Sequence, residues 1–250
     1  MLAQLKGPER SKYVTRMFDR ISTRYDSLNT IMPLGRHHSW KKKAVNHAVG
    51  NLSGIALDVA AGTGDISFEL CKKQEVSSVV AADFSREMLN VGVVKASNNS
   101  LETKFYPVVS DAHSMPFNTD SFICATIGFG VRNFVDLPRA LAEIKRVVKP
   151  GGKVVVLEIV KPRGKIMSRF FPLYFCNVTP ILGAMFAGEK AAYSYLPESV
   201  QGFMTSVELS SQMEGCGLED VYASQFAFGS MAIVSGTVPD ITMGQFSLSG

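Results

Sequence analysis

Short apolar runs alternate with amphipathic stretches along most of the chain. A short apolar run between turn residues is typical of a buried strand, and apolar residues spaced three and four apart are typical of a helix. Strands are expected at 55–57, 79–82, 105–109, 122–127 and 153–159, with helices between most of them. This alternation predicts an α/β fold built on a doubly wound parallel sheet.

Two predicted helices precede the sheet. Residues 12–28 and 36–48 both have apolar positions at helical spacing. Trp40, the only tryptophan, is expected to pack inward from the second of them. Together they predict a helical cap over residues 1–50.

The chain closes with one more helix and two strands. The helix is expected at 208–216, and the strands at 221–226 and 231–234. Because no repeat or long linker divides the chain, we expect a single domain over residues 1–236. Residues 237–250 are expected to form a loose tail.

An aromatic-rich segment interrupts the alternation at 163–205. Its apolar stretches, 170–175 and 180–186, contain Pro172 and Pro180 and are separated by polar residues. A membrane-spanning helix needs about 20 mainly apolar residues, so a span is not expected. The segment suits an inserted helical lid over an apolar substrate, and ordinary helix packing explains it equally well.

A turn of small residues follows the first predicted strand. The sequence IALDVAAGTGD at 55–65 places Gly62 and Gly64 just before a helical stretch. Such a turn lets a ligand approach the backbone, and the helix start offers unpaired N–H groups. Asp83 ends the next strand, 19 residues after Gly64, where an acid can accept both hydroxyls of a ribose.

Two ligand classes suit this turn: the nicotinamide or flavin dinucleotides and S-adenosylmethionine. The dinucleotide fingerprint would need Gly or Ala at position 67, where the chain has Ser67. Asp65 would also repel a pyrophosphate at the helix start. The sulfonium and ammonium groups of S-adenosylmethionine, in contrast, suit a site that holds Asp58 and Asp65. The pattern therefore favours S-adenosylmethionine, with a ligand-free strand-helix-strand crossover as the alternative.

Two later loops should meet at the same edge of the sheet. Asp111 can accept a hydrogen bond from an adenine amino group, with Ala112 leaving room for the ring and Met115 beneath it. An Asp-initiated turn explains these residues equally well. Arg132 and Asn133 follow the fourth strand, where doubly wound sheets place their chemistry, and both are strong donors.

Composition narrows the function classes further. The four cysteines include no C-x-x-C pair, which argues against a zinc site or a disulfide framework, and no metal is expected. Ten of the 26 Lys and Arg residues fall in residues 1–50, a segment that could meet nucleic acid, an anionic membrane or only water. The start lacks the apolar core of a signal peptide, so a cytoplasmic location is expected.

Several stretches of the sequence resemble the ubiquinone/menaquinone biosynthesis C-methyltransferase family. The resemblance covers nearly all of residues 12–236. Gly128 stands where relatives often carry Ser, and Ala61 stands where Gly is usual. The matching stretches are YDSLN at 25–29 with LGRHHSW at 34–40, LDVAAGTGD at 57–65, DAHSMPF at 111–117, FGVRN at 129–133 and RVVKPGGKVVVLEIVKP at 146–162.

The resemblance implies a Rossmann-like class I fold and a set of site residues. Arg132 and Asn133 would lie at a quinol ring as the catalytic residues. Further substrate contacts would come from the amino-terminal cap, at Tyr25, Asn29 and His37. The residues that would bind S-adenosylmethionine are Asp58, Gly62, Thr63, Gly64, Asp83, Asp111 and Ala112.

The expected reaction is the S-adenosylmethionine-dependent methylation of a ring carbon of a polyprenylated quinol. The resemblance favours demethylmenaquinol in menaquinone biosynthesis, with the equivalent step of ubiquinone biosynthesis as the alternative. Arg132 would stabilise the phenolate and Asn133 would orient the ring. The proton could go to a water, Tyr25, His37 or His113. The rivals are a dinucleotide oxidoreductase and a non-catalytic subunit of a quinone-synthesis assembly.

A polyprenyl substrate also implies where the protein works. Its tail stays in the bilayer, so we expect transient peripheral contact with the inner face of the membrane. Basic residues at 36–43, among them Lys41, Lys42 and Lys43, and the aromatic stretch 170–186 would make that contact. No nucleic-acid partner is expected, and a homodimer is left open.

Overall fold

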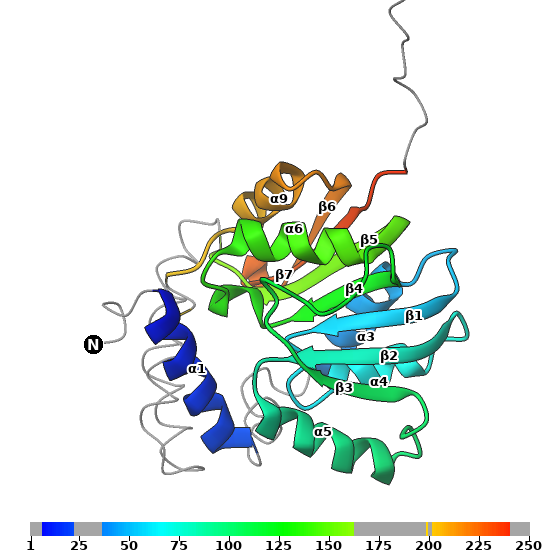
Figure 1. The fold of residues 1–250 in the computed structure, drawn as a ribbon. Coiled ribbons are helices and arrows are strands. Elements are labelled where there is room, and N and C mark those ends of the chain that lie inside the picture. Colours follow the sequence, from blue (N-terminus) through cyan, green and yellow to red (C-terminus); the bar gives the residue numbers. More distant parts are fainter. Residues whose placement is uncertain (1–6, 23–36, 163–198, 200–201, 241–250) are drawn as a thin grey trace, which may run out of the picture.

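The computed structural model describes residues 7–22, 37–162, 199 and 202–240. Its centre is a seven-stranded sheet with the order β3-β2-β1-β4-β5-β7-β6 (Figure 1). Strands β1 to β5 pair in parallel, whereas β7 runs antiparallel to both β5 and β6. The predicted doubly wound α/β class is confirmed. The strands are β1 (Gly54–Val59), β2 (Val76–Asp83), β3 (Phe105–Val109), β4 (Phe122–Gly128), β5 (Val148–Ile159), β6 (Glu219–Phe226) and β7 (Met231–Thr237).

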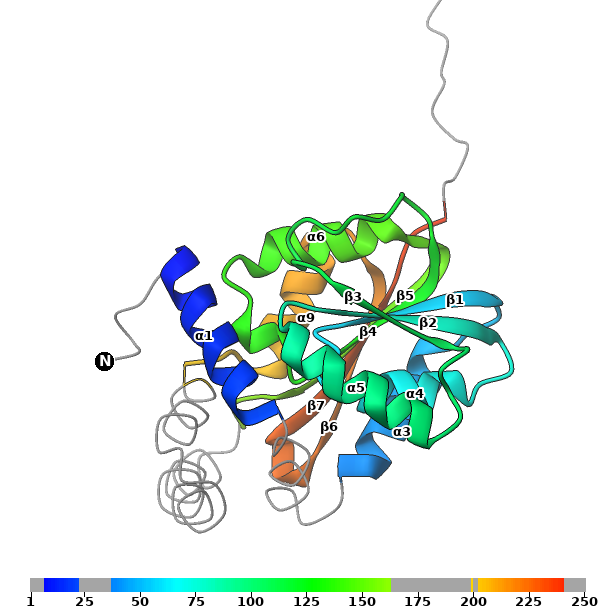
Figure 2. The same cartoon turned by 60° about the horizontal axis from the view of Figure 1, so that its bottom comes forward.

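Helices cover both faces of the sheet. Helices α3, α4 and α5 lie on one face, and α6 and α9 lie on the other (Figure 2). Helix α1 stands apart from both layers, beside α5 (Figure 1). The helices are α1 (Gly7–Ile21), α3 (His37–Ala48), α4 (Asp65–Cys71), α5 (Arg86–Asn98), α6 (Leu137–Val147) and α9 (Ser206–Gly215), with short 3-10 turns η3 (Val131–Asn133) and η4 (Ala227–Gly229).

The apolar runs in the sequence correspond to strands buried on both faces. In β4 every residue from Phe122 to Ile127 is buried, because helices shield it from above and below. Trp40 is 8% exposed and packs inward from α3, as expected. Two central layers of apolar side chains therefore hold the sheet, and its carboxyl edge is left for chemistry.

Helix starts are marked by side-chain caps. Ser85 accepts a hydrogen bond from the Met88 N–H and caps α5, a position where serine is favoured. Thr205 and Glu208 form a capping box, so α9 begins two residues before the expected start at 208. Helix α1 begins at Gly7, five residues earlier than predicted, with Glu9 in its first turn.

The strand expected at 153–159 begins five residues earlier, so the stretch 149–152, just after the end of α6, lies within β5. Gly152 packs so closely on β4 that a Cβ would come within 2.7 Å of the Ile123 carbonyl oxygen. Gly151 and Gly152 also exchange backbone hydrogen bonds with Val238, which is buried. The first residues of the expected loose tail are therefore part of the fold.

The predicted lid at 163–205 lies mostly outside the described residues. None of the helices that the structure describes is long and apolar enough to cross a membrane.

Candidate active site

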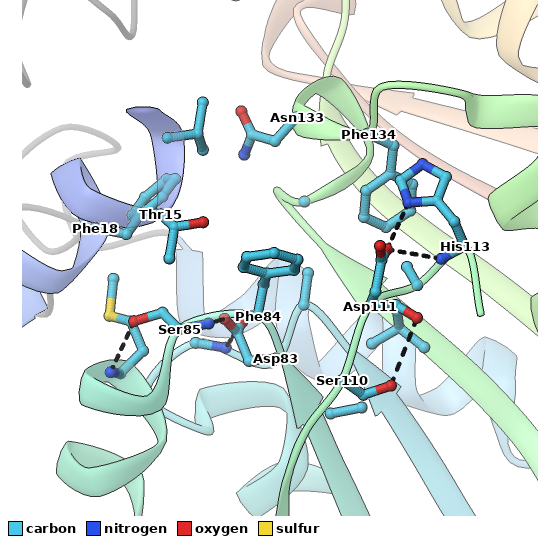
Figure 3. A pocket seen from close by; sticks show the side chains of 18 of the residues that line it. Thr15, Phe18, Asp83, Phe84, Ser85, Ser110, Asp111, His113, Asn133 and Phe134 are labelled. Atoms are coloured by element: carbon cyan, nitrogen blue, oxygen red, sulfur yellow. Dashed lines mark hydrogen bonds and ion pairs between the residues drawn. The ribbon is translucent and has the colours of Figure 1, made fainter. Parts of the chain in front are cut away.

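A cavity opens at the carboxyl edge of the sheet, next to the switch point between β1 and β4. Doubly wound sheets place ligands at such a point. Its walls come from the ends of β1, β2 and β4, the loop after β3, and helix α1. Figure 3 shows Asp83 and Phe84 on one side, Asp111 and His113 on another, and Asn133 opposite Thr15 and Phe18 of α1.

The turn after β1 has the backbone shape that its small residues permit. Gly62 and Gly64 have φ angles of 56° and 85°, in the left-handed region that glycine adopts without strain. Ala60 is also left-handed, with φ 54°, and Gly130 lies against it. A Cβ on Gly130 would come within 2.5 Å of the Ala60 Cβ, so the loops after β1 and β4 can meet only because residue 130 is glycine.

Asp83 lines the cavity from the end of β2. Its Oδ2 accepts the Gly62 N–H at 2.7 Å, and its Oδ1 accepts the Ser85 N–H at 2.8 Å. Burial raises the pKa of Asp83, although these backbone donors favour the charged form. A carboxylate oxygen can accept more than one hydrogen bond, so both oxygens can also serve a ligand. The arrangement suits a pair of ribose hydroxyls.

Asp111 lines the cavity from the loop after β3 and is fixed by His113. Its Oδ1 accepts the His113 backbone N–H at 2.9 Å and meets the His113 Nδ1 at 2.6 Å. Burial alone would raise the pKa of Asp111, but these His113 contacts outweigh burial and lower the pKa. Ala112 and Met115 line the same part of the cavity. An acceptor beside small and apolar side chains suits an adenine.

The His113 ring is engaged at both nitrogens. Its Nδ1 contacts Asp111, and its Nε2 accepts the Asp136 N–H at 3.2 Å, which assigns the hydrogen to Nδ1. The lone pair that could receive a proton from a substrate is therefore already used. Among the proton acceptors suggested by the sequence, this geometry disfavours His113.

Asp58 lies below the turn rather than in the cavity lining. It is 1% exposed, and its carboxylate accepts the Ser67 hydroxyl at 2.6 Å and the Thr126 hydroxyl at 2.8 Å. Burial raises the pKa of Asp58 to about 6, even though both hydroxyls favour the charged form. Asp58 therefore joins β1 to β4 and α4. Thr63 and Gly64 are likewise absent from the lining, and their cofactor contacts stay predictions.

Asp65 is paired by the protein's own lysines. Its two oxygens each meet an ammonium at 2.5 Å, Lys41 of α3 and Lys95 of α5. Burial alone would raise the pKa of Asp65, but the two ammonium groups outweigh it and lower the pKa to about 2. The expectation that Asp65 serves the cationic groups of S-adenosylmethionine is wrong, because its charge is already balanced.

The same ion pair corrects the expected membrane contact. Lys41 is 4% exposed, so it is not available to anionic lipid. Lys43 lies over the ring of Phe226, 4.7 Å from its centroid, and remains exposed, as does Lys42.

Arg132 and Asn133 point in different directions from η3. Asn133 lines the cavity, whereas Arg132 does not and is 7% exposed. The Arg132 Nη1 donates to the Oε1 of Glu158 at 2.5 Å, and the Arg132 N–H donates to Oε2 at 3.4 Å. Burial raises the pKa of Glu158, while the Arg132 guanidinium favours its charged form. The two residues expected to act together are therefore divided between the cavity and the core.

Two contributing residues were missed in the sequence. Glu158 interrupts the apolar stretch VVVLEI, and an acid in a strand buried on both faces signals a buried partner. Phe84 follows Asp83 and lines the cavity while 47% exposed, so part of its ring surface is open to a ligand.

The remaining predicted residues are only partly described. Gly62 and Ala112 line the cavity. Tyr25 and Asn29 lie outside the described residues, and of His37 only its place as the first residue of α3 is described. In the part of the chain that the structure describes, no group of three His, Cys, Asp or Glu side chains could hold a metal ion.

The cavity fits S-adenosylmethionine in its chemistry. Asp83 and Asp111 are acceptors of the kind that a ribose and an adenine amino group need, and Phe84, Ala112 and Met115 are apolar surfaces that would suit a purine. In overall fold the chain resembles a methyltransferase of Thermotoga maritima described as S-adenosylmethionine-dependent and a possible histamine N-methyltransferase, with a TM-score of 0.62 at 16% identity, over 90% of this chain and 99% of that one. The fold is that of the class I S-adenosylmethionine-dependent methyltransferases.

Sequence comparison identifies the family. The profile of the ubiE/COQ5 methyltransferase family matches residues 6–238, and the chain belongs to that family. It is 36% identical to the ubiquinone/menaquinone biosynthesis C-methyltransferase UbiE of Geotalea daltonii, over 92% of this chain and 98% of that protein. It is 38% identical to the demethylmenaquinone methyltransferase of Thermus thermophilus, over 89% of this chain and all of that protein. The family resemblance seen in the sequence is confirmed.

Proposed function

We propose that this enzyme transfers the methyl group of S-adenosylmethionine to a ring carbon of a polyprenylated quinol. The observation that carries the proposal is the cavity itself, which joins two carboxylate acceptors to an apolar wall and to Asn133. The carboxylates suit the nucleoside of the cofactor. Asn133 belongs to η3 and faces α1 (Figure 3). Together with the apolar wall it suits an aromatic ring that carries hydroxyl groups.

The cofactor is proposed to lie across the ends of β1 and β2. Asp83 would accept the two ribose hydroxyls, as acids at the end of the second strand do in related nucleotide sites. Asp111, held by His113, would accept the adenine amino group, and Phe84 would cover one face of the purine. The backbone of the turn at Gly62 and Gly64 would approach the amino-acid end of the cofactor, with Thr63 beside it.

The methyl transfer itself needs an electron-rich ring carbon. Loss of a proton from a ring hydroxyl pushes charge onto the neighbouring carbon, which attacks the sulfonium methyl as the carbon–sulfur bond breaks. The ring carbon then releases its hydrogen as a proton, the ring regains its aromatic form, and the phenolate oxygen takes up a proton again. The net products are the methylated quinol, S-adenosylhomocysteine and one proton.

We assign different parts of this step to Asn133 and Arg132. Asn133 lines the cavity and can hold a ring oxygen, which sets the angle of attack. Arg132 holds Glu158 instead, so we propose that it is a positioning residue that fixes η3 and thereby Asn133. The proton from the ring hydroxyl is proposed to leave through water, because the His113 ring is engaged at both nitrogens.

The ring is proposed to be a naphthoquinol, in the conversion of demethylmenaquinol to menaquinol. Demethylmenaquinone methyltransferases are among the relatives, at up to 38% identity. A benzoquinol of ubiquinone biosynthesis is the second candidate, because relatives named for both pathways match the chain equally well. A short-chain demethylnaphthoquinol and the matching benzoquinol, each kept reduced and given radiolabelled S-adenosylmethionine, test the proposal. Label transfer to neither quinol would overturn it, and transfer to the benzoquinol alone would reverse the choice of ring.

We also propose that the enzyme works from the cytoplasm at the membrane surface. The polyprenyl tail would stay in the bilayer, while Lys42 and Lys43 remain exposed for contact with anionic lipid. Co-sedimentation with anionic liposomes at low and high salt tests this contact, and absence of binding at low salt would refute it. A homodimer stays a prediction, to be checked by light scattering.

A further inference from the structure

Helix α1 forms a wall of the cavity, and its described apolar side chains do not belong to the clusters that hold the sheet. Val14, Thr15 and Phe18 line the cavity from α1 (Figure 3). Within the described residues, Val14 and Met17 form a small apolar cluster of their own with Tyr13 and Phe18 packed against it, separate from the clusters that hold the sheet. A polar contact with the sheet and its helices would therefore add to the attachment of α1.

Such a link joins α1 to the start of α5. The hydroxyl of Ser85 donates to the Oδ1 of Asp19 at 2.5 Å. The same hydroxyl accepts the Met88 N–H at 3.1 Å, since Ser85 caps α5. A hydroxyl has one hydrogen to donate, and here it goes to Asp19.

Ser85 also touches the carboxylate assigned to the ribose. Its backbone N–H donates to the Oδ1 of Asp83, and Asp83 accepts Gly62 with its other oxygen. Ser85 is 2% exposed, so these bonds lie away from bulk water. One residue therefore connects the wall α1, the start of α5 and the floor of the cofactor site.

We propose that Asp19 is a positioning residue for cofactor binding, which latches α1 across the cavity through Ser85 and steadies Asp83 beneath it. The inference rests on the proposed assignment of Asp83 to the cofactor ribose. Without the latch, the wall formed by α1 opens more readily and the cofactor dissociates faster. The methyl-transfer step, which takes place with the cofactor bound, is little changed.

Substitutions of Asp19 separate a latch from general stabilisation. Asp19→Ala removes the acceptor, and we expect the calorimetric dissociation constant of S-adenosylmethionine to rise about tenfold, with kcat at saturating cofactor within about twofold of wild type. Asp19→Asn keeps an oxygen that can accept the Ser85 hydroxyl and should restore most of the affinity. Arg20→Ala, an exposed change on the same helix, is the control and should bind normally.

Hydrogen exchange gives a second readout that does not depend on the affinity. S-adenosylmethionine should slow exchange of the α1 amides in the wild type and do so less in Asp19→Ala. Unchanged affinity in Asp19→Ala, an Asn variant as weak as the Ala variant, or no slowing in the wild type would each overturn the latch.

Asp83→Ala distinguishes a failure of the proposed latch from a failure of the assignment of Asp83 to the ribose. If Asp83→Ala binds S-adenosylmethionine normally, the ribose assignment is wrong. If Asp83→Ala binds weakly while Asp19→Ala binds normally, the assignment stands and only the latch is lost.

Discussion

The two sides of the cavity use charged side chains in opposite ways. On the cofactor side, Asp83 and Asp111 line the cavity and take their hydrogen bonds from nearby backbone N–H groups and from His113. On the side proposed for the ring, Arg132 and Glu158 pair with each other outside the lining, and Asn133, which lines the cavity, is uncharged. One side presents charge to a ligand, and the other keeps its charge within the protein.

The difference depends on what each charged group finds inside the chain. A buried charge is costly unless it is paired. Arg132 finds Glu158 and Asp65 finds two lysines, so neither needs a ligand to balance it. Among the described residues, Asp83 is held by backbone N–H groups and keeps acceptor capacity toward the cavity. Arg132 and Asp65, which are paired with opposite charges, lie outside the cavity lining, whereas Asp83 and Asp111 line the cavity.

The largest expected effect comes from breaking the pair on the ring side. Glu158→Leu leaves Arg132 charged and buried without its partner, which typically costs about 3–5 kcal/mol of unfolding free energy. Urea denaturation measures the loss. The double variant Arg132→Met with Glu158→Leu removes both charges and should recover most of the stability.

The double variant also tests the division between the two sides. If the double variant is stable and keeps most of its turnover, the charge of Arg132 takes no direct part in the methyl transfer. If it is stable but loses turnover about 10²-fold or more, Arg132 stabilises charge in the transition state and the two sides are more alike than the structure indicates.

The second-largest expected effect concerns Asp58, whose carboxylate lies below the turn after β1. Its pKa is raised from 3.8 to about 6, so folding favours the protonated acid. The stabilisation is full below pH 3.8 and is lost as the pH rises through 6. The amide side chain of the Asp58→Asn variant does not titrate. Its stability relative to wild type should therefore improve by about 3 kcal/mol between pH 3 and pH 7, as followed by denaturation at each pH. A difference that is flat with pH would show that Asp58 stays charged in the fold.

The sequence predicted the fold more completely than the site. Buried strands such as β4 leave a continuous apolar run, and Ser85 and Asp136 stand where helix caps are expected, so the element order could be derived. Asp83 could be placed because its position at the end of β2 follows from the spacing alone. The early start of β5 could not be predicted, since the close packing of Gly152 on β4 depends on a distant strand.

The site residues that could not be predicted depend on partners far away in the sequence. Lys41 and Lys95 lie 24 and 30 residues from Asp65, on either side of it, and Glu158 lies 26 residues from Arg132. The pattern around each charged residue shows that it needs a partner, but it does not show which one. The partners are set by tertiary packing, of α3 and α5 against the turn and of β5 behind η3. This packing decides which charged groups stay available to a ligand.

A smaller effect is expected for Asp83, the residue that most clearly represents the cofactor side. Asp83→Ala removes the acceptor for the ribose hydroxyls, and hydrogen bonds to a charged group contribute about 1.5–3 kcal/mol. The dissociation constant of S-adenosylmethionine should rise about 10- to 100-fold in calorimetric titration. The Michaelis constant for a short-chain quinol should change little. An equal loss in both constants would mean that the two sides of the cavity are not separate.

The smallest expected effect belongs to Asn133, the uncharged residue of the ring side. A hydrogen bond between neutral groups contributes about 0.5–1.5 kcal/mol, so Asn133→Ala should lower kcat up to about tenfold. Cofactor affinity should stay within about twofold, because Asn133 lies across the cavity from Asp83 (Figure 3). Asn133→Asp is the sharper variant, since it adds a negative charge beside the ring oxygen where the phenolate forms. If Asn133 contacts that oxygen, turnover should fall further in the Asp variant than in the Ala variant, by the repulsion between like charges. Equal turnover in the two variants would place the ring oxygen elsewhere in the cavity.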